Sequence, residues 1–176
     1  MARDRRLRKT EDAIQNAFIK LILDNGYESI KIGDLIEEAD INKSTFYLHY
    51  NSILGVSYAI EDRLISEALE TWNLCKGSLE ERLDSFFTFL LKDKKKYQAV
   101  IAVSDGHLFK KAESSFKPFF ERFREETDDK EMKPYRVSFY FGATYSVIRK
   151  WLVSSSRTDR KKLIKLLCEL LKTTGK

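Results

Sequence analysis

Five side chains in one short stretch have the chemistry to contact DNA. They are Lys43, Ser44, Thr45, Tyr47 and His49. Their amine, hydroxyl, phenol and imidazole groups are of the kinds that reach base edges and phosphates. Phe46 and Tyr50 are spaced i, i+4 among them, so on a helix these two would face a core and leave the five pointing outward. Without a surrounding motif, Tyr47 and His49 would be packing residues as readily as contact residues.

A helix-turn-helix unit would position that stretch. Apolar residues at i, i+3, i+4, i+7 and i+8 over residues 14–22 predict a first helix, which Asn25-Gly26 ends. A short second helix is predicted at about 32–39, Asp40 follows as a turn residue, and Asn42 is a good N-cap for the third helix. In such units that third helix projects its N-terminal side chains into the major groove.

A cluster of cations precedes the first helix. It consists of Arg3, Arg5, Arg6, Arg8 and Lys9, against the single acid Asp4. Such an arm suits phosphate contacts, which dominate non-specific affinity and make it depend on salt. The alternative reading of the cluster is a solvated terminal charge run.

The net charge of +5 comes from the other end of the chain. Residues 1–60 carry 8 Lys and Arg against 9 Asp and Glu, and residues 61–148 carry 15 against 16. Residues 149–176 carry 9 against 2 and supply the whole excess. Global basicity therefore says little about DNA, and the local arm is the informative feature.

The rest of the chain has the pattern of longer helices joined by short polar breaks. These helices are predicted at about 52–75, 79–93, 95–103, 107–126, 134–154 and 158–172. Only 7 Gly and 2 Pro interrupt the 176 residues, which also favours an all-α fold over a sandwich or barrel.

A more specific signature lies inside the helix-turn-helix stretch. Thr45-Phe46-Tyr47-Leu48-His49-Tyr50 follows Glu37-Glu38-Ala39 at a fixed distance, and Gly26-Tyr27-Glu28-Ser29-Ile30 precedes both. This pattern resembles the N-terminal domain of the TetR family of bacterial transcription regulators. The resemblance covers about residues 8–60, a third of the chain.

The resemblance implies an all-α homodimer of about nine helices per chain. Residues 1–51 would be a helix-turn-helix DNA-binding domain with its basic arm, and residues 52–176 a helical domain for dimerisation and effector binding. The partner would be double-stranded DNA with a palindromic operator. A small-molecule effector of unknown identity would bind between the fourth, fifth, seventh and eighth helical segments. The family's DNA-contact positions correspond to Lys31, Lys43, Ser44, Thr45, Tyr47 and His49.

Three positions depart from the family's pattern. Asp40 replaces a frequent turn glycine, Gly33 stands where many members place arginine, and Ile53 replaces a lysine at the start of the fourth helix. Asp tolerates a positive φ better than most residues, so the turn should survive. Because the lysine is missing, we expect DNA affinity to depend strongly on the arm and on Lys43.

The last two helices carry more apolar surface than one core needs. The eighth has two apolar faces and the ninth has a wide leucine face. Paired with the same helices of a second chain, they would form an isologous four-helix interface. The expected interface residues are Tyr140, Ala143, Val147, Trp151, Leu163, Leu167 and Leu170. The alternative is that both helices are buried within a monomer.

Catalytic and metal chemistry find little support in the sequence. Ser104, Asp105 and His107 are neighbours in one turn and cannot easily converge as nucleophile, base and orienting group. Two cysteines and two histidines exclude a disulfide scaffold and a four-cysteine zinc site. An aromatic stripe at Phe116, Phe119, Phe120 and Phe123 is more typical of a core than of a cofactor site.

We therefore expect no enzyme activity, no cofactor and no metal. We also expect neither a signal peptide nor a membrane-spanning segment, because no stretch has the required apolar pattern, and this favours a cytoplasmic protein. The function it favours is a dimeric DNA-binding transcription repressor controlled by a ligand in the C-terminal domain. Three alternatives stay open: control by a protein partner, action as an activator, and a helical interaction module that has lost DNA recognition.

Overall fold

The structure is a computed structural model that describes residues 2–122, 130–154 and 158–173. These residues form nine α-helices and one 3₁₀ turn, with no strand among them, so the all-α prediction is confirmed. The elements are α1 (Ala2–Asn25), η1 (Tyr27–Ser29), α2 (Ile32–Glu38), α3 (Lys43–His49), α4 (Ile53–Leu74), α5 (Leu79–Lys92), α6 (Lys94–Val103), α7 (His107–Arg122), α8 (Lys133–Val153) and α9 (Arg160–Thr173). None of these helices combines the length and the apolar character needed to cross a bilayer.

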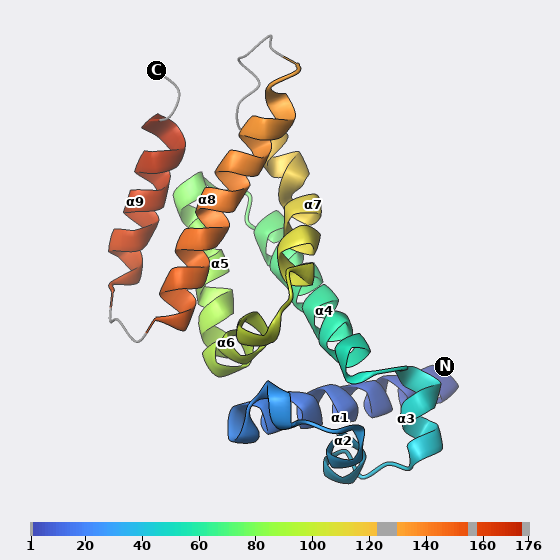
Figure 1. Ribbon diagram of the computed structural model, residues 1–176. Coiled ribbons are helices and arrows are strands. Elements are labelled where there is room, and N and C mark those ends of the chain that lie inside the picture. The colour runs from blue at the N-terminus through green and yellow to red at the C-terminus, as the bar shows by residue number, and fades with distance from the viewer. Residues whose placement is uncertain (1, 123–129, 155–157, 174–176) are drawn as a thin grey trace.

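The helices form a small unit and a larger bundle. In Figure 1, α1, α2 and α3 lie together at one end, and α4 leads from them into the bundle of α5 to α9. Within the bundle, α7 packs on α4 and on α8, while α9 packs on α5. Contacts between α1 and α6 join the small unit to the bundle beside the α4 connection.

The first helix, α1, holds the small unit together. Its apolar face meets α2 and α3 in a core whose fully buried members are Ile14, Phe18, Leu35 and Phe46. Lys20 Nζ lies 2.7 Å from Glu38 Oε1 and ties α1 to α2. Asp12 pairs with Arg63 and ties α1 to α4. Both acids therefore serve contacts within the small unit and with α4.

Local signals fix the turns of this unit. Gly26 has φ +77° after α1, a conformation that favours glycine. Among the described residues Asp40 is the one non-glycine residue with a positive φ, +51°, so the prediction that this turn tolerates Asp is confirmed. At the next cap, Asn42 Oδ1 accepts a hydrogen bond from Thr45 N at 2.7 Å, as predicted for the start of α3.

The basic arm is helical where the sequence pattern showed no helix. The apolar periodicity begins near residue 14, yet α1 starts at Ala2 and continues through the cations. Arg, Lys and Leu are good helix formers and need no apolar face to extend an established helix, which explains the difference. The cations are therefore presented on a helix and not on an extended arm.

Candidate functional site

Packing against α1 orients α3. Phe46 is fully buried, and its ring meets those of Tyr47 and Tyr50 at centroid distances of 5.4 and 6.2 Å. Gln15 Nε2 donates a hydrogen bond of 3.0 Å to Tyr50 Oη, which joins the end of α3 to the middle of α1. One apolar anchor and one polar contact thus fix which face of α3 points away from the protein.

That outward face carries most of the predicted DNA contacts. Lys43 and Ser44 are exposed, and Tyr47 is 46% exposed. The hydroxyls of Ser44 and Thr45 donate to Asn42 Oδ1 at 2.6 and 2.9 Å, so both lie at the N-terminal end of α3. This is the end of the helix whose free N–H groups and dipole favour an anion.

His49 does not share that outward face. Its side chain is only 4% exposed, and its Nδ1 lies 3.4 Å from Glu11 Oε1 on α1. The prediction that the imidazole points outward is therefore wrong. His49 follows Phe46 by three residues, and three residues along a helix return to nearly the same face. We assign His49 the role of holding α3 on α1.

One exposed residue of α3 was missed by the sequence analysis. Leu48 is 74% exposed on the face opposite Phe46, beside Tyr47. A position two residues from a core residue lies across the helix, so the periodicity contained this signal. An apolar side chain there is suited to contact a thymine methyl group.

The remaining predicted DNA contacts lie on α1 and α2. Lys31 is exposed at the N-cap of α2, where its backbone N–H donates to Asp34 Oδ2 at 2.8 Å. Four cations of the N-terminal cluster are exposed along α1, while the side chain of Arg3 lies outside the described residues. The exposed four are Arg5, Arg6, Arg8 and Lys9. These cations closely precede Glu11, the residue of α1 that meets His49 of α3.

The start of α4 has no cation to offer DNA. Ser52 caps the helix by accepting a hydrogen bond of 3.0 Å from Gly55 N. Ile53 is half-buried and packs against the core, and Leu54 is exposed. Ile53 therefore contributes to the packing at the start of α4 and offers no positive charge there.

The predicted dimer residues divide between the core and the surface. Tyr140, Leu163 and Leu167 are buried inside the protomer, so they are not available to a partner and the prediction is corrected at these positions. Val147 and Trp151 are half-buried, and the Trp151 ring meets Phe87 of α5 at 4.8 Å. The predicted residues that remain exposed are Ala143 and Leu170.

A partly different set of apolar residues is exposed on the same two helices. On α8 it contains Phe139, which is 60% exposed, together with Tyr135, Ala143 and Val153 at helical spacing. On α9 it contains Leu166 and Leu170. We call these six residues the α8–α9 face. Neither of the two apolar faces that periodicity gave α8 contained Phe139, Tyr135 or Val153, so the sequence analysis missed these exposed residues.

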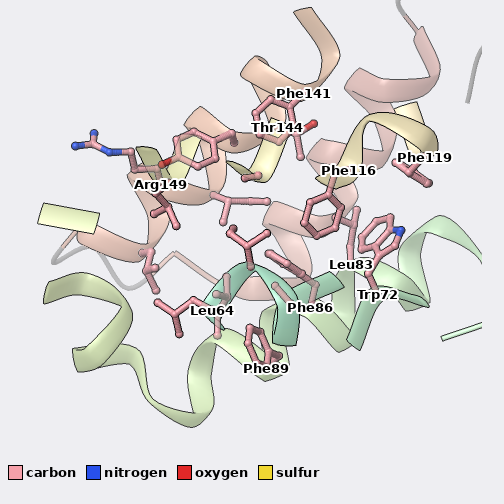
Figure 2. A pocket seen from close by; sticks show the side chains of 18 of the residues that line it. Leu64, Trp72, Leu83, Phe86, Phe89, Phe116, Phe119, Phe141, Thr144 and Arg149 are labelled. Carbon is pink, nitrogen blue, oxygen red and sulfur yellow. The ribbon is translucent and has the colours of Figure 1, made fainter. Parts of the chain in front are cut away.

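A cavity of about 120 Å³ lies within the C-terminal bundle. Its walls come from all six helices α4 to α9, which include the four segments predicted to form a pocket. Figure 2 shows Trp72, Phe86, Phe116 and Phe119 gathered at one side of it. The Trp72 ring meets the other three edge-on at 4.7 to 6.3 Å. The predicted aromatic stripe thus contributes both to packing and to the cavity wall, and Phe123 lies outside the described residues.

A polar cluster joins α4 to the turn before α7. Tyr58 Oη donates to Asp105 Oδ2 at 2.8 Å, and its ring stacks on His107 at 4.2 Å. His107 Nε2 lies 3.1 Å from Asp62 Oδ1. Ser104 Oγ accepts a hydrogen bond of 3.3 Å from Leu108 N. The turn that resembled a nucleophile set thus fastens α7 to the first half of α4.

Glu61 lies fully buried beside this cluster. Ser57 Oγ donates to Glu61 Oε1 at 3.3 Å, whereas Oε2 has no hydrogen-bond partner among the described residues. Burial raises the pKa of the Glu61 carboxyl above its ordinary value, and the hydroxyl donors and His107 only partly offset this. The protonated form of Glu61 is therefore more favoured in the folded chain than in the unfolded chain. The stability that the protonated acid contributes is lost as the pH rises through the raised pKa.

Replacing Glu61 with glutamine should raise the free energy of unfolding at neutral pH, because no buried charge is then formed. The gain should shrink towards about pH 4, where the wild-type carboxyl is protonated in both folded and unfolded chains. Urea unfolding of both proteins across that pH range measures the difference. Glu70→Gln, an exposed position on α4, is the control. A Glu61→Gln protein that is less stable at neutral pH would contradict the prediction.

Comparisons with known proteins agree with this architecture. The TetR-family model described as "Transcriptional regulator C-terminal region" matches residues 77–173. No curated protein sequence matches the chain significantly.

Among solved structures, a TetR transcriptional regulator from Streptococcus agalactiae is 24% identical, with a TM-score of 0.76 over 97% of this chain and 98% of that one. A fatty acid degradation regulator, FadR, from Bacillus halodurans is 19% identical, with a TM-score of 0.66 over 92% and 94%. A transcriptional regulator of the TerR/AcrR family from Aquifex aeolicus is 21% identical, with a TM-score of 0.66 over 93% and 98%. These likenesses show a shared fold over nearly the whole chain. Because the family model covers more than half of the sequence, the chain belongs to the TetR family of transcriptional regulators.

Proposed function

We propose that this protein is a dimeric, DNA-binding transcription repressor whose operator affinity is controlled by a small ligand. The single observation that carries the proposal is the outward face of α3, where Lys43, Ser44 and Tyr47 are exposed on a helix anchored by buried Phe46. Residues 1–51 act as the DNA-reading domain and residues 52–176 as the dimerisation and effector domain. DNA as the partner is consistent with a cytoplasmic location.

In the proposed complex, α3 lies in the major groove. Tyr47 and Leu48 contact base edges, while Lys43 and Lys31 contact phosphates. The cations on the first turns of α1 contact the neighbouring phosphates, because Glu11, two residues after Lys9 on α1, meets His49 of α3. The α8–α9 face pairs two chains so that their α3 helices meet successive half-sites of a palindromic operator.

Selection from random DNA, followed by fluorescence anisotropy, tests this assignment. We expect a palindromic site that binds more tightly than its scrambled duplex. Tyr47→Ala should lower the affinity for that site by roughly 5- to 150-fold, because it removes base contacts, and should change the affinity for the scrambled duplex little. Lys43→Ala should weaken both duplexes, because it removes a phosphate contact. Equal binding of the selected and scrambled duplexes would refute the proposal and favour an interaction module that has lost DNA recognition.

Removing residues 1–9 should weaken binding to both duplexes and reduce the salt dependence. A plot of log affinity against log salt has a negative slope, and each lost phosphate contact makes that slope less steep by roughly 0.9. Because residues 1–60 have a net charge of −1, these cations supply much of the local attraction. Titrations at several salt concentrations measure the slope, with Lys161→Ala on α9 as a control. An unchanged slope in the truncated protein would contradict the prediction.

Ligand control of the regulator is supported by the cavity in the C-terminal bundle. Its wall includes Leu64, Ile65 and Trp72 of α4, the helix that follows α3 directly. A ligand that binds one orientation of α4 more tightly than another would shift the distance between the two α3 helices of a dimer. A reporter gene behind the selected operator distinguishes repression from activation by the sign of its change.

A further inference from the structure

The chemistry of the cavity wall restricts what the cavity can hold. All but four of the residues that line it have aliphatic, phenyl or indole side chains; the four are Tyr97, Thr144, Tyr145 and Arg149. Almost no polar atom faces the interior. A polar ligand would therefore bury its own groups without hydrogen-bond partners, which is costly.

The charged and titratable groups of the wall offer no counter-charge. Figure 2 shows the guanidinium of Arg149 extending away from the cavity, and Arg149 is exposed. Burial raises the pKa of both Tyr97 and Tyr145, so these phenols stay neutral at physiological pH. Neither an anionic nor a cationic ligand meets an opposite charge inside the cavity.

Two buried polar atoms in the wall also lack partners. Trp72 Nε1 and Thr144 Oγ1 have no hydrogen bond among the residues that the structure describes, and both residues are at least nine-tenths buried. An ordered water needs two or more polar partners, and the two residues lie apart in Figure 2. A dry apolar cavity of this size is comparable to the engineered cavity of about 150 Å³ that binds benzene.

We propose that the cavity takes an uncharged, hydrocarbon-like molecule about the size of one substituted aromatic ring. The identification of this molecule as the effector rests on the regulator proposed above, whereas its binding does not. The edge-on contacts around Trp72 favour an aromatic ring over a chain, because a further ring can extend the same edge-to-face arrangement.

The test uses three probes of nearly equal size and different charge: toluene, benzoate and benzylamine. Isothermal titration calorimetry with the full-length protein measures their affinities. We expect toluene to bind, and both charged probes to bind at least roughly 100-fold more weakly, because each would bury an unpaired charge. Comparable or tighter binding of benzoate or benzylamine, or no binding of toluene, would overturn the proposal.

Variants that fill the cavity test its location. Ala112→Leu on α7 and Ala68→Leu on α4 add bulk from two walls and should each weaken toluene binding at least roughly 10-fold. Ala102→Leu on α6, which is exposed and outside the wall, is the matched control. Circular dichroism shows whether each cavity variant folds. If one of the two does not fold, the toluene affinity of the other provides the test. Unchanged toluene affinity in a folded cavity variant would also overturn the proposal.

Operator binding, measured in parallel, separates this proposal from the proposed regulator. If the wild-type protein binds toluene but shows no selective DNA binding, the proposed regulator function is refuted and the proposed ligand chemistry is retained. Selective DNA binding with no affinity for toluene would refute only the ligand chemistry. A change in operator affinity on saturation with toluene, abolished by Ala112→Leu, would support both.

Discussion

Phe139→Arg or Leu166→Arg should convert the proposed dimer to a monomer. Both side chains belong to the α8–α9 face and are exposed in the protomer, so the substitutions should leave the fold of one chain intact. In an isologous interface each substitution occurs twice, which brings two cations to the same buried surface. We expect the dimer dissociation constant to rise by at least roughly 100-fold, because the buried charges lack partners.

The same variants should lose most of their operator affinity. Two linked DNA-reading domains gain roughly 10²- to 10⁴-fold over one domain through effective concentration, and a monomer forfeits that gain. Sedimentation velocity gives the oligomeric state, and anisotropy on the selected operator gives the affinity. Leu74→Arg, at an exposed leucine near the end of α4, is the control. A Leu166→Arg protein that remains dimeric would place the interface on another surface.

The sequence predicted the local parts of the fold well because their causes are local. Asn42 caps α3 through its own side chain, and Asp40 adopts a positive φ within its own turn. Helix positions followed from a 3.6-residue apolar period, which depends on spacing and not on the partner. The polar beginning of α1 has no such period, so its helix was not predicted.

The site was harder to predict because it depends on which neighbour covers each face. Periodicity gave α8 two apolar faces, but only tertiary packing shows that Tyr140 faces the core and Phe139 the surface. His49 has the chemistry of a contact residue, yet Glu11, distant in sequence, meets it within the protein. The cavity has no sequence signature, since each lining residue is the kind that also fills a core.

Replacing Phe46 with alanine should destabilise the protein by about 3–5 kcal/mol, the usual cost of emptying a buried aromatic site. Phe46 is the fully buried side chain that joins α3 to α1. Such a loss is a large fraction of the stability of an ordinary domain. Urea unfolding at one fixed protein concentration measures it, because dimer stability depends on concentration.

A second alanine variant on the same helix separates support from recognition. Leu48 is 74% exposed, so Leu48→Ala should change the free energy of unfolding by no more than about 0.5 kcal/mol. If Leu48 contacts a thymine methyl, Leu48→Ala should still lower the affinity for the selected operator. Replacing that thymine with uracil should remove the difference in affinity between wild type and variant. Phe46→Ala should instead weaken binding to every duplex, because α3 is no longer held. Normal stability in Phe46→Ala would mean that Tyr50 and His49 alone fix α3 on α1.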